Sequence, residues 1–69
     1  MYPNLNAERA RRNITLEEIA VKMNKRLATI SNKFNGRYPI TLNEAAQIKE
    51  IIGTDLPLEI LFSTEAIKN

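Results

Sequence analysis

The sequence predicts an all-α protein, a compact bundle of five short helices in one domain spanning residues 1–69. Apolar residues recur every three or four positions, as on one face of a helix, and no segment alternates apolar and polar residues as a strand does. Capping residues, Gly and Pro mark where the helices begin and end. A chain of 69 residues has room for one small core.

The composition limits the chemistry that the protein can perform. The chain contains neither Cys nor His, which excludes disulfide bonds, a thiol nucleophile and the usual zinc or haem ligands. His is also the commonest general base, and neither Ser31 nor Ser63 has a base positioned to activate it. We therefore expect no enzyme, no metal site and no small-molecule cofactor.

No segment of the sequence has the character of a membrane span or a secretory signal. A span needs about 18 consecutive apolar residues, and a signal peptide begins with a basic segment followed by an apolar one. The sequence has neither, so we expect a cytoplasmic protein without a membrane partner.

Two segments of nearly the same sequence predict two helix starts. Residues 14–20 and 40–46 differ only at their fourth and sixth positions. In each segment a Thr stands three residues before a Glu, the pattern of a capping box: Thr15 before Glu18, and Thr41 before Glu44.

Residues 15–35 predict two short helices joined by a tight turn. The first helix carries an apolar stripe formed by Leu16, Ile19, Ala20 and Met23. Asn24 follows, and Asn tolerates the left-handed backbone conformation that turns a chain sharply. The second helix, at about residues 26–35, ends at Asn35-Gly36 and has a stripe formed by Leu27, Ile30 and Phe34. The segment is thus a helix-turn-helix pattern.

The same kinds of signal predict the other three helices. Asn4 predicts the cap of a first helix that runs to about Arg12. After Pro39 comes a helix that ends at Gly53, with a stripe formed by Leu42, Ala45, Ala46, Ile48 and Ile52. Pro57 predicts the start of a last short helix with Leu58, Leu61 and Phe62. Residues 63–69 are expected to fray.

Basic residues concentrate around the predicted helix-turn-helix. The formal net charge of the chain is only +2. Residues 22–37, however, contain no Asp or Glu and these basic residues: Lys22, Lys25, Arg26, Lys33 and Arg37. Such a block is either a solvated face or a surface that binds phosphates.

These features resemble the helix-turn-helix family of lambda-type repressors, Cro proteins and xenobiotic-response-element regulators. The resemblance covers residues 5–62 and is most specific in residues 14–24 and in Phe34-Asn35-Gly36. The family places a small, a turn and an aliphatic residue at the spacing of Ala20, Asn24 and Ile30. Residues 1–5 and 58–62 also look like those of small Cro-like regulators from phages and mobile elements of Gram-positive bacteria.

The resemblance implies a sequence-specific DNA-binding transcription regulator that acts as a homodimer on double-stranded DNA. Base contacts in the major groove are expected from Leu27, Ala28, Thr29 and Asn32. Phosphate contacts are expected from Lys22, Lys25, Arg26, Lys33, Asn35, Arg37 and Tyr38. The apolar C-terminal residues either close the monomer core or form the dimer contact: Leu58, Ile60, Leu61, Phe62 and Ile67.

Three positions depart from the family pattern. Leu16 stands where a phosphate-binding Gln is common, Leu27 where the second helix begins with a polar residue, and Arg26 where Ser or Thr caps that helix. Leu16 lies on a core stripe, and Leu27 either packs with the core or contacts a thymine methyl or a partner protein. The alternative function is therefore a protein-interaction module on the same fold, an anti-repressor or antitoxin-like partner. The absence of Asp and Glu from residues 22–37 argues against this alternative, because a surface that no longer binds DNA would not need to exclude acidic residues.

Overall fold

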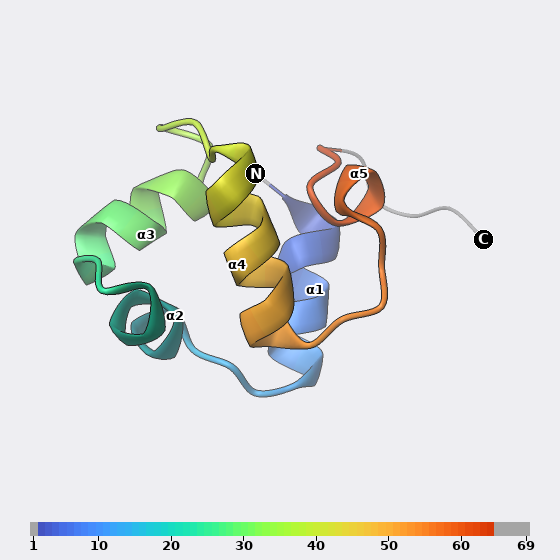
Figure 1. Cartoon of the computed structure of the whole chain (residues 1–69), viewed down its shortest axis with the longest axis horizontal. Helices are drawn as coiled ribbons and strands as arrows, with labels where there is room; N and C mark the ends of the chain where they lie inside the picture. The colour runs from blue at the N-terminus through green and yellow to red at the C-terminus, as the bar shows by residue number, and fades with distance from the viewer. Residues whose placement is uncertain (1, 65–69) are drawn as a thin grey trace.

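Helix boundaries in the computed structural model follow the capping and turn residues of the sequence. The structure describes residues 2–64, which form five helices and no strand (Figure 1): α1 (Pro3–Arg11), α2 (Leu16–Met23), α3 (Leu27–Phe34), α4 (Leu42–Ile52) and α5 (Leu58–Leu61). The predicted all-α class with five helices is confirmed for this part of the chain. Most of the segment predicted to fray, residues 65–69, lies outside the described residues.

The two threonines predicted to cap helices do so. The Thr15 hydroxyl accepts the Glu18 N–H at 3.1 Å, and the Thr41 hydroxyl accepts the Glu44 N–H at 3.2 Å. Only at α4 is the capping box complete, because the Glu44 carboxylate in turn accepts the Thr41 N–H at 3.0 Å. The Glu18 carboxylate instead receives a long contact of 3.5 Å from the Thr15 hydroxyl. The predicted box is therefore half formed at α2 and fully formed at α4.

The prediction that Asn4 caps the first helix is wrong. The helix begins at Pro3, and Tyr2 occupies the cap position without a side-chain hydrogen bond. Pro suits the first helical position because its φ angle is already helical and it has no N–H to satisfy. Asn4 lies inside the helix, where its buried side-chain amide donates to the Ile60 carbonyl at 2.9 Å. It thereby joins α1 to α5.

Left-handed residues end two of the helices, as predicted. Asn24 has φ 56° and ψ 46° after α2, and Gly53 has φ 76° after α4. The Lys25 N–H then donates back to the Ala20 carbonyl at 2.9 Å, which satisfies the end of α2. The chain needs only three residues, 24–26, to pass from α2 to α3.

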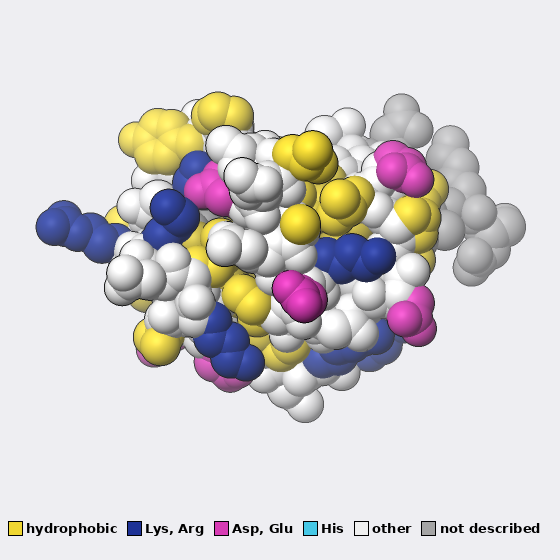
Figure 2. All heavy atoms as spheres, in the orientation of Figure 1, with side chains coloured by type: hydrophobic (Ala, Val, Ile, Leu, Met, Phe, Trp, Pro, Cys, Tyr) yellow, Lys and Arg dark blue, Asp and Glu magenta, His cyan; other side chains and the backbone are white. Residues whose placement is uncertain are grey.

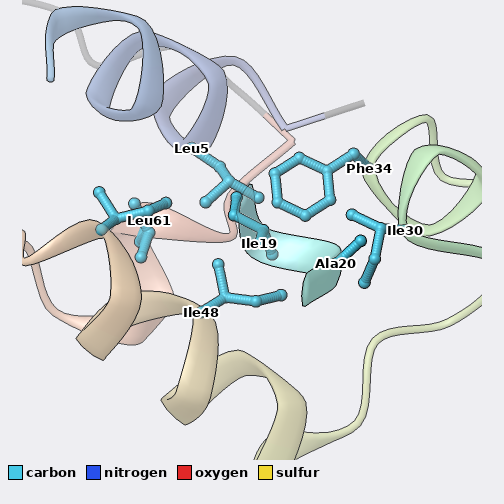
Figure 3. Close-up of a cluster of buried hydrophobic side chains, with 8 residues drawn as sticks. Leu5, Ile19, Ala20, Ile30, Phe34, Ile48 and Leu61 are labelled. Carbon is cyan, nitrogen blue, oxygen red and sulfur yellow. The ribbon is translucent and has the colours of Figure 1, made fainter. Parts of the chain in front are cut away.

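The core is formed by apolar residues from all five helices. Its buried members are Leu5, Ile19, Ala20, Ile30, Phe34, Ile48, Ile52 and Leu61, most of which are labelled in Figure 3. Leu16, Met23 and Phe62 are partly buried and pack against this cluster. The predicted inner faces of residues 16–23 and of Ile30 with Phe34 are thus confirmed.

The stripe predicted along α4 is correct only in part. Ala45, Ile48 and Ile52 are buried, whereas Leu42 is 75% exposed and Ala46 is also exposed. At 3.6 residues per turn, Leu42 lies about 90° around the helix from the centre of the buried face, and Ala46 about 130°. The sequence pattern admitted a wider stripe than the neighbouring helices cover.

The helices are arranged so that α3 and α5 lie at opposite sides of the molecule. In Figure 1, α4 crosses the middle, α2 and α3 lie to its left, and α1 and α5 lie to its right. Helix α2 packs against α3 and α4, while α5 packs against α1 and α4. The end of the molecule formed by α3 is therefore well separated from α5.

Among residues 2–64, no helix is both long and apolar enough to span a bilayer.

A buried carboxylate connects α1 to the segment between α4 and α5. Glu8 is buried, and its Oε1 atom accepts hydrogen bonds from the Thr54 hydroxyl and from Arg12 at 2.9 Å. Arg11 forms an ion pair with the other oxygen at 3.2 Å. The Thr54 hydrogen bond is the main reason why the pKa of Glu8 lies below its ordinary value, although burial opposes the shift.

Candidate nucleic-acid interface

Helix α3 presents one face to the core and the opposite face to solvent. Ile30 and Phe34 are buried against the rest of the fold, and α2 packs beside them. Asn32 lies about 180° around the helix axis from the centre of that buried face, at 3.6 residues per turn. Ala28 and Thr29 flank Asn32 on the same outer face. An outer face of this kind can enter the major groove of a DNA duplex.

The four residues predicted to contact bases differ in accessibility. Leu27 and Ala28 are exposed, and Thr29 and Asn32 are half-buried. Among residues 2–64 the Asn32 side chain has no hydrogen-bond partner, so its amide can donate and accept at a base edge. The outer face therefore offers the Asn32 amide, the Thr29 hydroxyl and the Ala28 methyl group, whereas Leu27 lies on the side of Ile30 and Phe34 and is exposed at the N-terminal end of α3.

The two unusual leucines have different environments. Leu16 packs against the core cluster, as expected from its place on the α2 stripe. Leu27 is 44% exposed and is not a core residue. Packing therefore explains why position 16 is a leucine, but it does not explain Leu27. Leu27 is accessible for contact with a base or with a partner protein.

The N-terminus of α3 has no side-chain cap. Arg26 occupies the cap position in an extended conformation and makes no capping hydrogen bond. The first N–H groups of α3 thus lack the acceptor that Ser or Thr would supply. Anions are favoured at such a position because the N–H dipoles point toward them.

The loop after α3 directs its backbone inward and its side chains outward. The Asn35, Gly36 and Arg37 N–H groups donate to the carbonyls of Ser31, Lys33 and Asn32, at 3.0, 3.2 and 2.9 Å respectively. These N–H groups are not available to a phosphate. Asn35, Arg37 and Tyr38 are exposed, so any phosphate contact from this loop uses their side chains or the Tyr38 backbone.

The basic residues lie around α3 but do not form a uniform positive surface. Figure 2 shows Lys and Arg side chains at the left, over α3, with an acidic side chain against them. Glu44, at the start of α4, forms an ion pair with Lys33 at 3.0 Å and with Lys25 at 3.7 Å. Within residues 2–64 the other three members of the block form no ion pair: Lys22, Arg26 and Arg37.

Glu44 is the residue that sequence reasoning missed. Its place in the sequence indicated only a capping box, and nothing in the spacing indicates that two lysines of the basic block face it. The pKa of Glu44 lies below its ordinary value, mainly because its carboxylate accepts the Thr41 N–H and to a smaller extent because it pairs with Lys33. Burial opposes this shift. Glu44 is therefore charged at neutral pH.

An apolar groove lies between the start of α4 and α5. It has a volume of about 520 Å³, and its apolar lining consists of Tyr2, Ile40, Leu42, Ala45, Leu58 and Phe62. Tyr2 and Phe62 meet edge to face, with ring centroids 5.7 Å apart. Figure 2 shows hydrophobic side chains at the surface between α4 and α5. Of the predicted C-terminal apolar residues, Leu61 is buried, Ile60 is exposed, and Ile67 lies outside the described residues.

Neither a cluster of metal ligands nor a similarity to known proteins gives further information on this interface. Within residues 2–64, no three acidic side chains gather as ligands for a metal ion. No family model, curated protein or solved structure matches the chain. The indications of function are therefore the outer face of α3, the residues around it and their charges.

Proposed function

We propose that the protein is a sequence-specific DNA-binding transcription regulator in which α2 and α3 form a helix-turn-helix. The supporting observation is the two-sided character of α3, with Ile30 and Phe34 buried and the half-buried Asn32 on the opposite side of the helix. The proposal includes the lambda-repressor-like fold, Cro/repressor-like regulation, and an origin in a phage or mobile element. It also includes action in the cytoplasm without enzymatic activity or a cofactor.

Base reading is assigned to the outer face of α3 and to Leu27, which is exposed at the N-terminal end of the helix. The Asn32 amide can form two hydrogen bonds with adenine, and the methyl groups of Ala28, Thr29 and Leu27 can contact the thymine methyl. Such contacts distinguish one base pair from another, so this face would determine the preferred site.

Phosphate binding is assigned to the residues around α3. They are Lys22, Lys25, Arg26, Lys33, Asn35, Arg37 and Tyr38. Contacts of this kind supply affinity and orientation on the duplex without reading its sequence. Lys25 and Lys33 are paired with Glu44 in the free protein, so they contribute only where a phosphate displaces Glu44.

We propose further that the protein binds as a homodimer whose contact is the apolar groove. Leu42 lines it and is 75% exposed, and burying Leu42 in a second copy would remove apolar surface from water. A two-fold dimer would place its α3 helices on half-sites about 34 Å apart. Sedimentation at micromolar concentration tests this, and a strict monomer both free and on DNA would exclude the dimer.

The test of the proposed function is selection of bound duplexes from a random pool at a stated salt concentration. A palindromic motif with two half-sites is the expected result. Binding without sequence preference, or no binding, would contradict sequence-specific regulation. It would favour the alternative, a protein-interaction module of the anti-repressor or antitoxin-like kind, which the exposure of Leu27 supports.

A further inference from the structure

We propose that Glu44 is an internal counter-charge that restrains Lys25 and Lys33 and so limits binding to DNA of any sequence. The inference rests on the proposed function, since it concerns the same basic surface. It begins from the position of Glu44, the only acidic side chain that pairs with the basic block among residues 2–64.

The carboxylate of Glu44 is held in place by its own helix. Its Oε1 atom accepts the Thr41 N–H at 3.0 Å as part of the capping box, and its side chain is only 12% exposed. A carboxylate with this support cannot easily turn away from the lysines. Its position is therefore set by α4 and not by the mobility of a long side chain.

The two lysines are restrained to different degrees. The Lys33 ammonium donates both to Glu44 Oε1 and to the Pro39 carbonyl, each at 3.0 Å, and its side chain is 14% exposed. It would have to give up both contacts to reach a phosphate. Lys25 lies 3.7 Å from Glu44 Oε2 and is 38% exposed. Lys25 is thus the lysine that loss of the Glu44 charge would release first.

Restraint of these lysines has a measurable effect on DNA binding. Each cation that reaches a phosphate adds about 0.9 to the slope of log affinity against log salt. Affinity for random DNA comes almost entirely from such contacts, whereas affinity for a preferred site also includes base contacts. A counter-charge beneath the basic surface would therefore lower the affinity for duplexes of any sequence and make binding less dependent on salt.

The experiment compares Glu44→Gln with Glu50→Gln on a duplex of random sequence. Both changes raise the net charge by one and lie on α4, but Glu50 is exposed and pairs with no member of the basic block. Gln keeps a carbonyl acceptor for the Thr41 N–H. Fluorescence anisotropy between 50 and 200 mM salt gives affinity and slope, and circular dichroism verifies folding.

We expect Glu44→Gln to steepen the slope by about 0.9 as Lys25 becomes available, which corresponds to about eightfold tighter binding at 0.1 M salt. Glu50→Gln should change the affinity less than twofold. A loss of stability alone would weaken binding, so a gain in affinity separates a counter-charge from a purely structural role.

Two lysine variants test the same inference without altering Glu44. Lys22 is exposed and unpaired among the described residues, so Lys22→Gln should reduce the slope by about 0.9, whereas Lys25→Gln should leave it nearly unchanged. Equal reductions by the two variants, or a Glu44→Gln variant that is folded and binds like wild type, would overturn the inference alone. Wild-type protein that binds no duplex would overturn the proposed function, and the inference with it.

Discussion

The hydrogen bond between Thr54 and Glu8 is buried at both ends, which makes Thr54→Val a sensitive test of the fold. The Thr54 hydroxyl donates to Glu8 Oε1 and also accepts the Leu56 N–H at 3.2 Å. Val has nearly the shape of Thr, so the substitution removes the hydroxyl without opening a large cavity. A hydrogen bond to a charged group contributes about 1.5–3 kcal/mol, and we expect the free energy of unfolding at pH 7 to fall by about this amount.

The loss should be smaller in acid, because the hydrogen bond depends on the charge of Glu8. In the folded protein, the pKa of Glu8 is lowered, mainly by Thr54. A lowered pKa stabilises the fold above the unfolded value of about 4.3, and this contribution disappears as the pH falls through the folded pKa. Glu44, whose pKa is also lowered, behaves alike in both proteins and cancels in the comparison. Loss of the Leu56 hydrogen bond does not depend on pH.

The assay is urea denaturation at pH 7 and at about pH 2.5, followed by the helical circular dichroism signal. Thr54→Val should cost about 1.5–3 kcal/mol at pH 7 and about 1 kcal/mol less in acid, where a neutral hydrogen bond contributes about 0.5–1.5 kcal/mol. Thr64→Val, at an exposed position, should change stability by less than about 0.5 kcal/mol. Equal losses at the two pH values would refute the reasoning, because the bond would then not depend on the Glu8 charge.

Three further predictions concern α3 and the loop after it. Asn32→Ala should weaken binding to the selected duplex by about 1–3 kcal/mol and relax one base position; equal losses on selected and random duplexes would show that Asn32 does not read a base. Arg37→Ala should weaken binding to both duplexes alike and reduce the salt slope by about one unit, so an unchanged slope in a salt titration would exclude this phosphate contact. Phe34→Ala removes a buried ring and should cost about 3–5 kcal/mol by urea denaturation, from the roughly 3–10 kcal/mol that a chain of this length possesses. A variant with wild-type stability would show that Phe34 does not hold α3 on the core.

Local features of this fold could be predicted because their causes lie within a few residues. Thr15 and Thr41 cap helices through N–H groups three residues away, and Asn24 and Gly53 turn the chain through their own backbone conformation. The buried faces of α2 and α3 follow from the helical repeat. Each of these signals depends on sequence distance and not on which other helix is nearby.

Features that depend on distant segments could not be predicted. Asn4 has the residue type of a cap, but its amide donates to Ile60 near the other end of the chain. Leu42 has the residue type of a core position, but no other helix within residues 2–64 covers its side of α4. In both cases the residue type indicates whether the side chain is polar or apolar. What the side chain contacts depends on how α4 and α5 pack against the other helices.

The candidate interface likewise has features that could be predicted from nearby residues and features that depend on distant segments. The helical repeat places Asn32 opposite Ile30 and Phe34, so the outer face of α3 could be predicted from spacing alone. The basic block could also be predicted, since it is continuous in the sequence. Its division into paired and unpaired cations could not, because Glu44 lies outside residues 22–37 and meets Lys25 and Lys33 only after α4 has packed.

The two nearly identical capping segments show how packing changes a local motif. Glu18 and Glu44 occupy the same position in it, yet Glu18 is exposed and its carboxylate makes only a 3.5 Å contact with the Thr15 hydroxyl. Glu44 completes its capping box and is half-buried between two lysines. Lysines that attract the carboxylate favour the conformation in which it also accepts the Thr41 N–H, so the cap and the ion pairs support each other. The motif therefore starts a helix at both sites, but only at α4 does it also connect that helix to the proposed DNA-reading helix.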